Sequence, residues 1–136
     1  MTPEELIALA KEAMTRAYAP YSGFKVGATL LCQDGTVYQG CNIENAAFSP
    51  TVCAERTAIF KAVSEGKREF AAIAVCGGKD GVITGLFPPC GVCRQVVAEF
   101  CGADFPVYLA DANGVWEKKT LAELLPLSFS AGEHMQ

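Results

Sequence analysis

The chain has 136 residues, of which 51% are hydrophobic and 19% charged, so it can bury the core of one compact domain and does not resemble a disordered segment. Its net charge of −4 disfavours a phosphate-tracking groove, and therefore a long DNA or RNA partner. The sequence has neither a membrane-length apolar stretch nor a basic secretory start, so we expect no membrane span and a cytoplasmic protein.

The first third of the chain predicts a helix followed by a β-hairpin. Thr2 and Glu5 form the pattern of a helix capping box, and apolar residues then recur at helical spacing, which predicts an amphipathic helix over 2–18. Apolar residues occupy every second position from 24 to 32, a period of two that predicts a strand. An Asp-Gly pair then predicts a tight turn into a second, antiparallel strand at 36–40.

Further strands and helices alternate along the rest of the chain. We predict, in order, a helix at 52–65, a buried strand at 70–76, a glycine-rich loop at 77–85, a helix at 90–101, strands at 107–110 and 115–117, and a helix at 120–125. Residues 1–136 are interpreted as a single domain with a frayed tail at 130–136. This order predicts an α/β fold: a three-layer α/β/α sandwich whose mixed five-stranded sheet has helices on both faces.

Seven cysteines in a chain without an export signal are more consistent with free thiols or metal ligands than with a disulfide framework. Cys90 and Cys93 lie one turn apart at the start of a predicted helix, a spacing that suits either zinc or a redox pair. Cys53 supplies a third thiol at the start of another helix, whereas the only histidine, His134, lies in the expected tail. Three cysteines therefore favour a zinc site with its fourth position open to water.

A closed, structural zinc site is the alternative, and it would need a fourth cysteine ligand. The remaining candidates lie inside predicted strands or at the ends of elements: Cys32, Cys41, Cys76 and Cys101. At such positions cysteine is ordinarily a small buried hydrophobic residue, and we interpret these four in that way.

Glu55 and Arg56 directly follow the first candidate ligand, Cys53. A glutamate in the first turn can simply stabilise the helix dipole, but beside a zinc-bound water it can also carry a proton to a leaving amine. Three thiolates give a Zn²⁺ site a net charge of −1, which weakens its power to acidify water. We hypothesise that Arg56 offsets this charge by hydrogen-bonding the ligand sulfurs, with Arg94 adding positive potential. A solvated surface arginine is the alternative.

Several segments together resemble one enzyme family. They are Tyr18-Ala-Pro-Tyr-Ser-Gly-Phe-Lys-Val-Gly, Gly40-Cys-Asn-Ile-Glu-Asn-Ala-Ala-Phe-Ser, Cys53-Ala-Glu-Arg-Thr-Ala and Pro89-Cys-Gly-Val-Cys93. From the first helix to about Phe129, the chain resembles the short, homotetrameric, zinc-dependent cytidine deaminases. This resemblance implies the cytidine deaminase-like fold.

The resemblance also implies a reaction and a cofactor. Cys53, Cys90 and Cys93 would bind one Zn²⁺ per subunit, and Glu55 would shuttle protons while zinc-bound hydroxide attacks C4 of the base. Cytidine and deoxycytidine would become uridine and deoxyuridine with release of ammonia, as part of pyrimidine salvage.

The same resemblance implies how the nucleoside is bound. Phe24 would stack near the pyrimidine, Asn42 and Glu44 would hydrogen-bond the ribose hydroxyls, and the Ala54 backbone would hold the base edge. The residues alone favour other interpretations: Phe24 as a core residue, and Asn42 and Glu44 as solvated loop residues.

Neighbouring subunits of a homotetramer would complete each site through Ala46, Phe48 and Phe129. Many relatives have tyrosine at the position of Phe48, so this chain keeps the apolar wall there and lacks the hydroxyl.

Three alternative functions follow from the same residues. The chain could be a related zinc deaminase acting on another amino-substituted nucleoside or base, such as a blasticidin-type or free-base substrate. It could be a non-catalytic zinc module whose cysteines stabilise the fold. A nucleic-acid editor is the third alternative, and the acidic net charge disfavours it.

Overall fold

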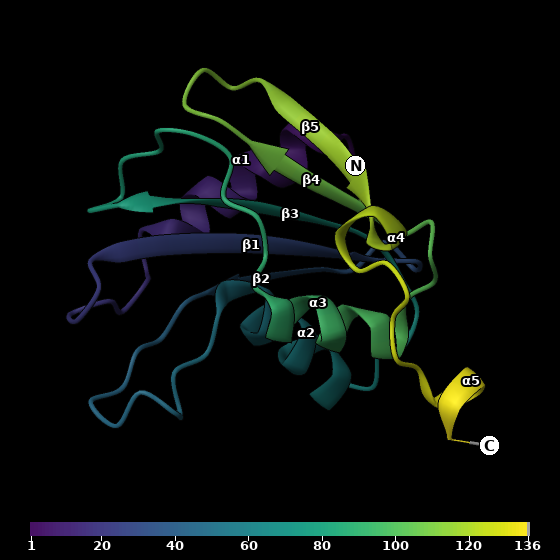
Figure 1. Ribbon diagram of the computed structural model, residues 1–136. Helices are drawn as coiled ribbons and strands as arrows, with labels where there is room; N and C mark the ends of the chain where they lie inside the picture. Colours follow the sequence, from purple (N-terminus) through teal and green to yellow (C-terminus); the bar gives the residue numbers. More distant parts are fainter. Residues whose placement is uncertain (136) are drawn as a thin grey trace.

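The computed structural model describes residues 1–135 as a five-stranded sheet covered by helices on both faces (Figure 1). The elements are α1 (Pro3–Met14), β1 (Phe24–Cys32), β2 (Val37–Cys41), α2 (Ala54–Ser64), β3 (Phe70–Lys79), α3 (Gly91–Phe100), β4 (Pro106–Ala110), β5 (Trp116–Thr120), α4 (Leu121–Leu124) and α5 (Ala131–His134). The strand order is β2-β1-β3-β4-β5, with β3 and β4 parallel and all other neighbours antiparallel. The predicted mixed α/β sandwich is confirmed.

The central strand β3 separates two hydrophobic cores. Ala72, Ala74 and Cys76 pack with α1 on one face, and Ile73 and Val75 pack in the core that contains α2 on the other. Successive side chains of a strand point to opposite faces, so a strand covered on both faces reads as one continuous apolar run. This double burial explains why the sequence shows no alternation there.

Close approach of α2 to the sheet depends on Gly40 in β2. A Cβ atom at Gly40 would lie 2.4 Å from the carbonyl oxygen of Ala54 and 2.6 Å from the backbone nitrogen of Ala58. Both contacts are shorter than side chains tolerate, so only glycine lets the helix lie this close. The position of the first turn of α2, where Glu55 lies, is thereby fixed against the strand.

The first helix ends earlier than its sequence pattern predicts, at Met14 instead of residue 18. After Met14 the chain turns toward the loop that follows β2, where the N–H of Tyr18 donates to the carbonyl of Asn42 at 3.0 Å. The N–H of Glu44 donates in return to the carbonyl of Tyr18 at 2.9 Å. These long-range bonds replace helical ones, although the apolar spacing continues past Met14.

The prediction of a loop at 77–85 is wrong for its first three residues, because β3 continues to Lys79. Gly77 and Gly78 pair with Val26 and Lys25 of the long strand β1, which supplies hydrogen-bonding partners that glycine composition does not reveal. The extension brings Lys79 into register with the first residue of β1.

The other predicted elements are present with small shifts at their ends, and α5 lies within the tail that was expected to fray. The last residue of that tail, Gln136, lies outside the described residues. Within residues 1–135, no helix is both long enough and apolar enough to cross a membrane.

Candidate metal centre and active site

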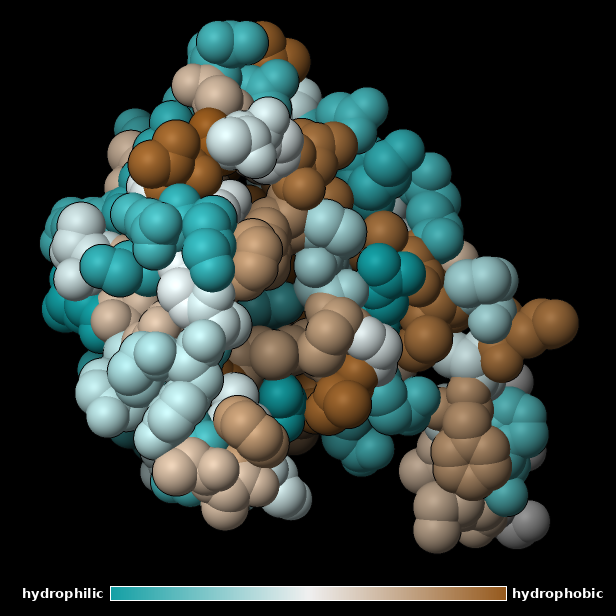
Figure 2. Space-filling view, turned by 60° about the vertical axis from the view of Figure 1, so that its left-hand side comes forward, coloured by the Kyte–Doolittle hydropathy of each residue, from teal (hydrophilic) through white to brown (hydrophobic). Residues whose placement is uncertain are grey.

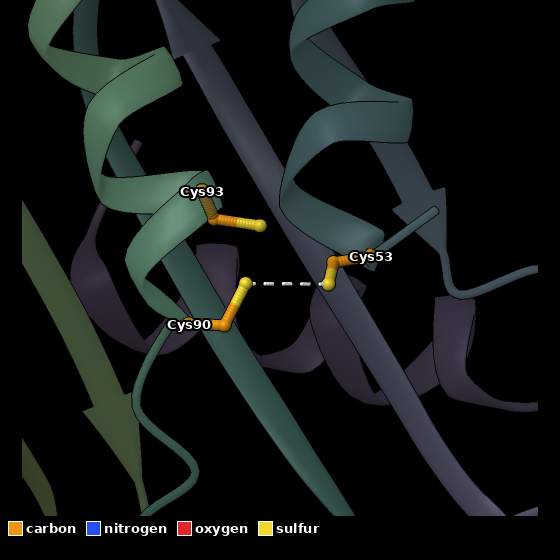
Figure 3. A group of neighbouring side chains, drawn as sticks. All are labelled: Cys53, Cys90 and Cys93. Atoms are coloured by element: carbon orange, nitrogen blue, oxygen red, sulfur yellow. Dashed lines mark hydrogen bonds between the residues drawn. The ribbon is translucent and has the colours of Figure 1, made fainter. Parts of the chain in front are cut away.

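Two helix N-termini bring three cysteines together (Figure 3). Cys53 is the N-cap residue of α2, Cys90 is the N-cap of α3, and Cys93 lies in the first turn of α3. Neither N-cap thiol hydrogen-bonds the backbone of its own helix. The sulfur atoms point toward one another instead, although Cys53 and Cys90 are 37 residues apart in sequence.

The three sulfur atoms fit a zinc ion. All lie within 4.8 Å of one another, and the Sγ atoms of Cys53 and Cys90 are 3.6 Å apart. Zinc–sulfur bonds of about 2.3 Å in a tetrahedron place sulfur atoms ~3.8 Å apart. Within residues 1–135 no fourth cysteine, histidine or carboxylate joins this group. The donor set therefore suits a three-ligand site with one free position, and not the closed alternative.

Electrostatics around the cysteines favours a thiolate at Cys53. A hydrogen bond with the Cys93 thiol, together with hydrogen bonds from Arg56 and Cys90, lowers the pKa of Cys53 to about 5 although burial opposes the shift. The pKa of the Cys93 thiol is raised by the same hydrogen bond and by burial. Metal binding requires deprotonated thiols, so one ligand is already prepared for it.

The two arginines next to the cysteines have different partners. Arg56 donates from Nη2 to the Sγ atom of Cys53 over 3.3 Å. Arg94 donates from Nε to the carbonyl of Pro89 and from Nη1 to that of Leu124, both at 2.7 Å. Arg56 therefore contacts a ligand sulfur, whereas Arg94 holds the loop that leads into Cys90.

Glu55 is a buried carboxyl group in the first turn of α2, with 3% of its surface exposed. Burial raises the pKa of Glu55 to about 7, and the negative charge of Cys53 adds to the shift. A carboxyl group with this pKa exchanges its proton near neutral pH, which a surface glutamate does not. The helix-dipole interpretation alone does not account for this burial.

Phe24, which begins β1, is 43% exposed, so it is not a core residue. Its ring lies 6.1 Å from that of Phe87, centroid to centroid, and 5.3 Å from Lys79 Nζ. The sequence indicates neither neighbour, because glycine-rich composition predicts a loop at Lys79, and Phe87 has no signal beyond its place three residues before Cys90.

Asn42 is anchored to the start of β1, and Glu44 to the segment just before that strand. Asn42 is buried; its Oδ1 accepts from the N–H of Val26 at 2.8 Å and its Nδ2 donates to the carbonyl of Phe24 at 2.7 Å. Glu44 Oε1 accepts from the N–H groups of Tyr21 and Ser22 at 2.9 and 3.0 Å. Neither residue is the freely solvated loop residue of the alternative interpretation.

The remaining candidates divide between the interior and two projecting segments. Ala54 is fully buried at the first position of α2. Ala46 and Phe48 lie exposed on the loop between β2 and α2, and Phe129 is 57% exposed on the C-terminal segment, stacked on His134 at 5.0 Å. The two segments extend on opposite sides in Figure 1, and the C-terminal one stands off from the body in Figure 2.

Comparison with known proteins identifies the family. Residues 1–109 match the family described as the cytidine and deoxycytidylate deaminase zinc-binding region. The chain belongs to this family. A cytidine deaminase of Sporosarcina psychrophila is 56% identical over 130 residues, which are 96% of this chain and 93% of that protein. A cytidine deaminase of Halalkalibacterium halodurans is 51% identical over 131 residues, 96% of each chain.

Solved structures of the deaminase family agree with the fold. The crystal structure of the cytidine deaminase from Burkholderia pseudomallei has a TM-score of 0.87 and 47% sequence identity. The match covers 95% of this chain and 100% of that one. Zinc is thus the cofactor that both the family and the three-cysteine group indicate.

Proposed function

We propose that this chain hydrolyses cytidine and deoxycytidine to uridine and deoxyuridine, with release of ammonia, as part of pyrimidine salvage. The observation that carries the proposal is Glu55, a buried carboxyl group next to three cysteines whose geometry leaves a fourth zinc position free. The cytidine deaminases named above support cytidine over another amine as the substrate.

Glu55 is proposed to move the proton in this reaction. Zinc, when bound, lowers the pKa of a water molecule and so supplies a nucleophile at neutral pH. The Glu55 carboxylate accepts a proton as water adds to C4, and later donates it to the amine that leaves as ammonia. A pKa of about 7 allows both transfers at similar cost. One water molecule is consumed for each ammonia released.

Other residues are proposed to compensate the charge of the metal site and to bind the nucleoside. Arg56 offsets part of the negative charge of three thiolates through its hydrogen bond to Cys53. Phe24 contacts the pyrimidine, Asn42 and Glu44 bind the ribose hydroxyls, and the Ala54 backbone holds the base edge. The anchoring of Asn42 and Glu44 by backbone hydrogen bonds supports their role, because fixed polar groups discriminate strongly between ligands.

We also propose that the chain works as a homotetramer in which Ala46, Phe48 and Phe129 complete neighbouring sites. Large apolar side chains are exposed on the surface, which supports burial between subunits. They include Phe48 at 69%, Phe60 at 48%, Val92 at 56%, Leu127 at 105% and Phe129 at 57% exposure. The seven cysteines of residues 1–135 form no disulfide, which supports a reducing compartment that we infer to be the cytoplasm.

The decisive experiment compares the wild type with Glu55→Gln, following cytidine loss by ultraviolet absorbance and zinc content in parallel. The amide keeps the shape of the side chain and cannot shuttle a proton, so turnover should fall by at least about a hundredfold while zinc is retained. Turnover close to wild type in Glu55→Gln would refute the proton-transfer role, and zinc without any deamination in the wild type would favour a structural module.

Two further measurements test the substrate and the assembly. Cytidine, deoxycytidine, cytosine and blasticidin S are compared as substrates. Turnover of cytosine or blasticidin S alone would overturn the assignment of cytidine and deoxycytidine. Shared sites predict that mixing inactive Glu55→Gln subunits with impaired Phe129→Ala subunits restores part of the activity. A monomer by light scattering would refute the tetramer.

A further inference from the structure

Lys79, at the end of β3, shares a face of the sheet with Phe24. The two residues pair in register, so their side chains lie on the same side of neighbouring strands. The Nζ atom of Lys79 is 5.3 Å from the centroid of the Phe24 ring, which is within cation–π distance. Phe24 therefore contacts a cation as well as the ring of Phe87.

Hydrogen bonds through the turn at 19–23 link the Lys79 ammonium group to the Glu44 carboxylate. Lys79 Nζ donates a hydrogen bond to the carbonyl of Ser22 at 2.6 Å. The N–H of Ser22 in turn donates to the Glu44 carboxylate, as does the N–H of Tyr21. Hydrogen bonds from the hydroxyl and N–H of Ser22 lower the pKa of Glu44, and the charge of Lys79 adds to the effect.

Gly23 makes room for this arrangement. Its φ of +75° is unfavourable for other residues, and a Cβ atom there would lie 3.1 Å from Lys79 Nζ and 3.2 Å from Lys79 Cε. The backbone N–H of Asp80 also donates to the carbonyl of Gly23 at 2.7 Å. The turn at 19–23 is thus fastened to the end of β3 by one side chain and one backbone bond.

We infer that Lys79 is a positioning residue for the nucleoside. It fixes the turn that holds the Glu44 carboxylate in place for the ribose hydroxyls, and it contacts the Phe24 ring that faces the pyrimidine. This inference rests on the proposed function, since it assigns Lys79 to the binding of that substrate. The residue acts on binding and has no part in proton transfer, because its contacts are to Ser22 and Phe24 and not to Glu55 or the cysteines.

The first test is the steady-state kinetics of Lys79→Met with cytidine. Loss of one exposed charged contact is expected to raise KM about fivefold, with kcat within about twofold of wild type. Lys79→Arg keeps a cationic donor and should restore KM. Lys25→Met is the matched control. Lys25 follows Phe24 in β1 and pairs with Gly78, so its side chain points to the opposite face of the sheet.

The second test uses product binding, so that it does not depend on turnover. Calorimetry gives the dissociation constants of zinc-loaded protein for uridine and for 2′,3′-dideoxyuridine. Lys79→Met should weaken binding of uridine more than binding of the dideoxy compound, which lacks the hydroxyls that Glu44 would bind. Zinc content and thermal midpoint of each variant are recorded, and Lys79→Gln replaces Lys79→Met if the latter does not fold.

Equal weakening of both ligands, an unchanged KM, or the same loss in Lys25→Met would overturn the role of Lys79. If the wild type turns over cytidine and Lys79→Met has the same KM and dissociation constants, this inference is refuted and the proposed function stands. A wild type without cytidine turnover refutes the proposed function, and the inference with it.

Discussion

Replacing Gly40 by alanine should displace the helix that carries the metal site. The added Cβ atom would lie 2.4 Å from the Ala54 carbonyl oxygen and 2.6 Å from the Ala58 nitrogen, whereas ordinary contacts begin at 3.4 Å. The start of α2 must therefore move by about 1 Å, because both opposing atoms belong to the backbone. Overpacking of this kind costs about 2 kcal/mol, which corresponds to a loss of roughly 8 °C in the thermal midpoint.

The assay is thermal unfolding at fixed protein and zinc concentrations, together with the zinc content of the purified protein. Gly102→Ala is the matched control, since a Cβ atom at Gly102 meets nothing within 4 Å. We expect Gly40→Ala to lose both stability and part of its zinc, because Cys53 and Glu55 move with α2. A midpoint for Gly40→Ala equal to that of Gly102→Ala would refute the reasoning that glycine sets the distance between α2 and β2.

The remaining predictions concern two charged contacts. Arg56→Gln removes the guanidinium that donates to Cys53 Sγ, and we expect zinc affinity in a chelator competition to fall by about tenfold, whereas the exposed Arg68→Gln should leave it unchanged. Retention of full affinity in Arg56→Gln would remove this role. A hydrogen bond from Lys67 at 2.6 Å holds the pKa of Asp34 well below its usual value, so the folded state is stabilised above pH ~4 and loses this contribution as the pH falls further. In Lys67→Met, the urea midpoint should therefore fall less steeply than in the wild type between about pH 4 and pH 2. The same pH dependence in both proteins would contradict a stabilising role for the Lys67–Asp34 contact.

The helices and strands that sequence reasoning located best are those with a strong local signal. The capping box predicted for Thr2 and Glu5 is present at the start of α1. The alternating strand β1 begins and ends at the predicted residues. Such signals need only residues that are near one another in sequence, so the chain displays them without its tertiary structure.

The errors lie where distant segments determine the local structure. The helical pattern continues past Met14, but the helix ends there, and Tyr18 bonds instead to Asn42 and Glu44. Gly77 and Gly78 have low strand propensity, but β1 offers them a partner strand. In both regions hydrogen bonds to segments that are remote in sequence outweigh local preference.

The sequence by itself determined the chemistry available to this protein: three cysteines in two helix-start motifs, a glutamate two residues after the first, and no histidine outside the tail. Only the tertiary structure decided that the three sulfurs meet within 4.8 Å, that Glu55 is buried, and that Lys79 lies against Phe24. The physical reason is that the sequence gives the residue types, and their spacing determines only the local geometry within a helix or strand. Distances and burial depend on how the two helices pack against the sheet, and close packing fixes them only after folding.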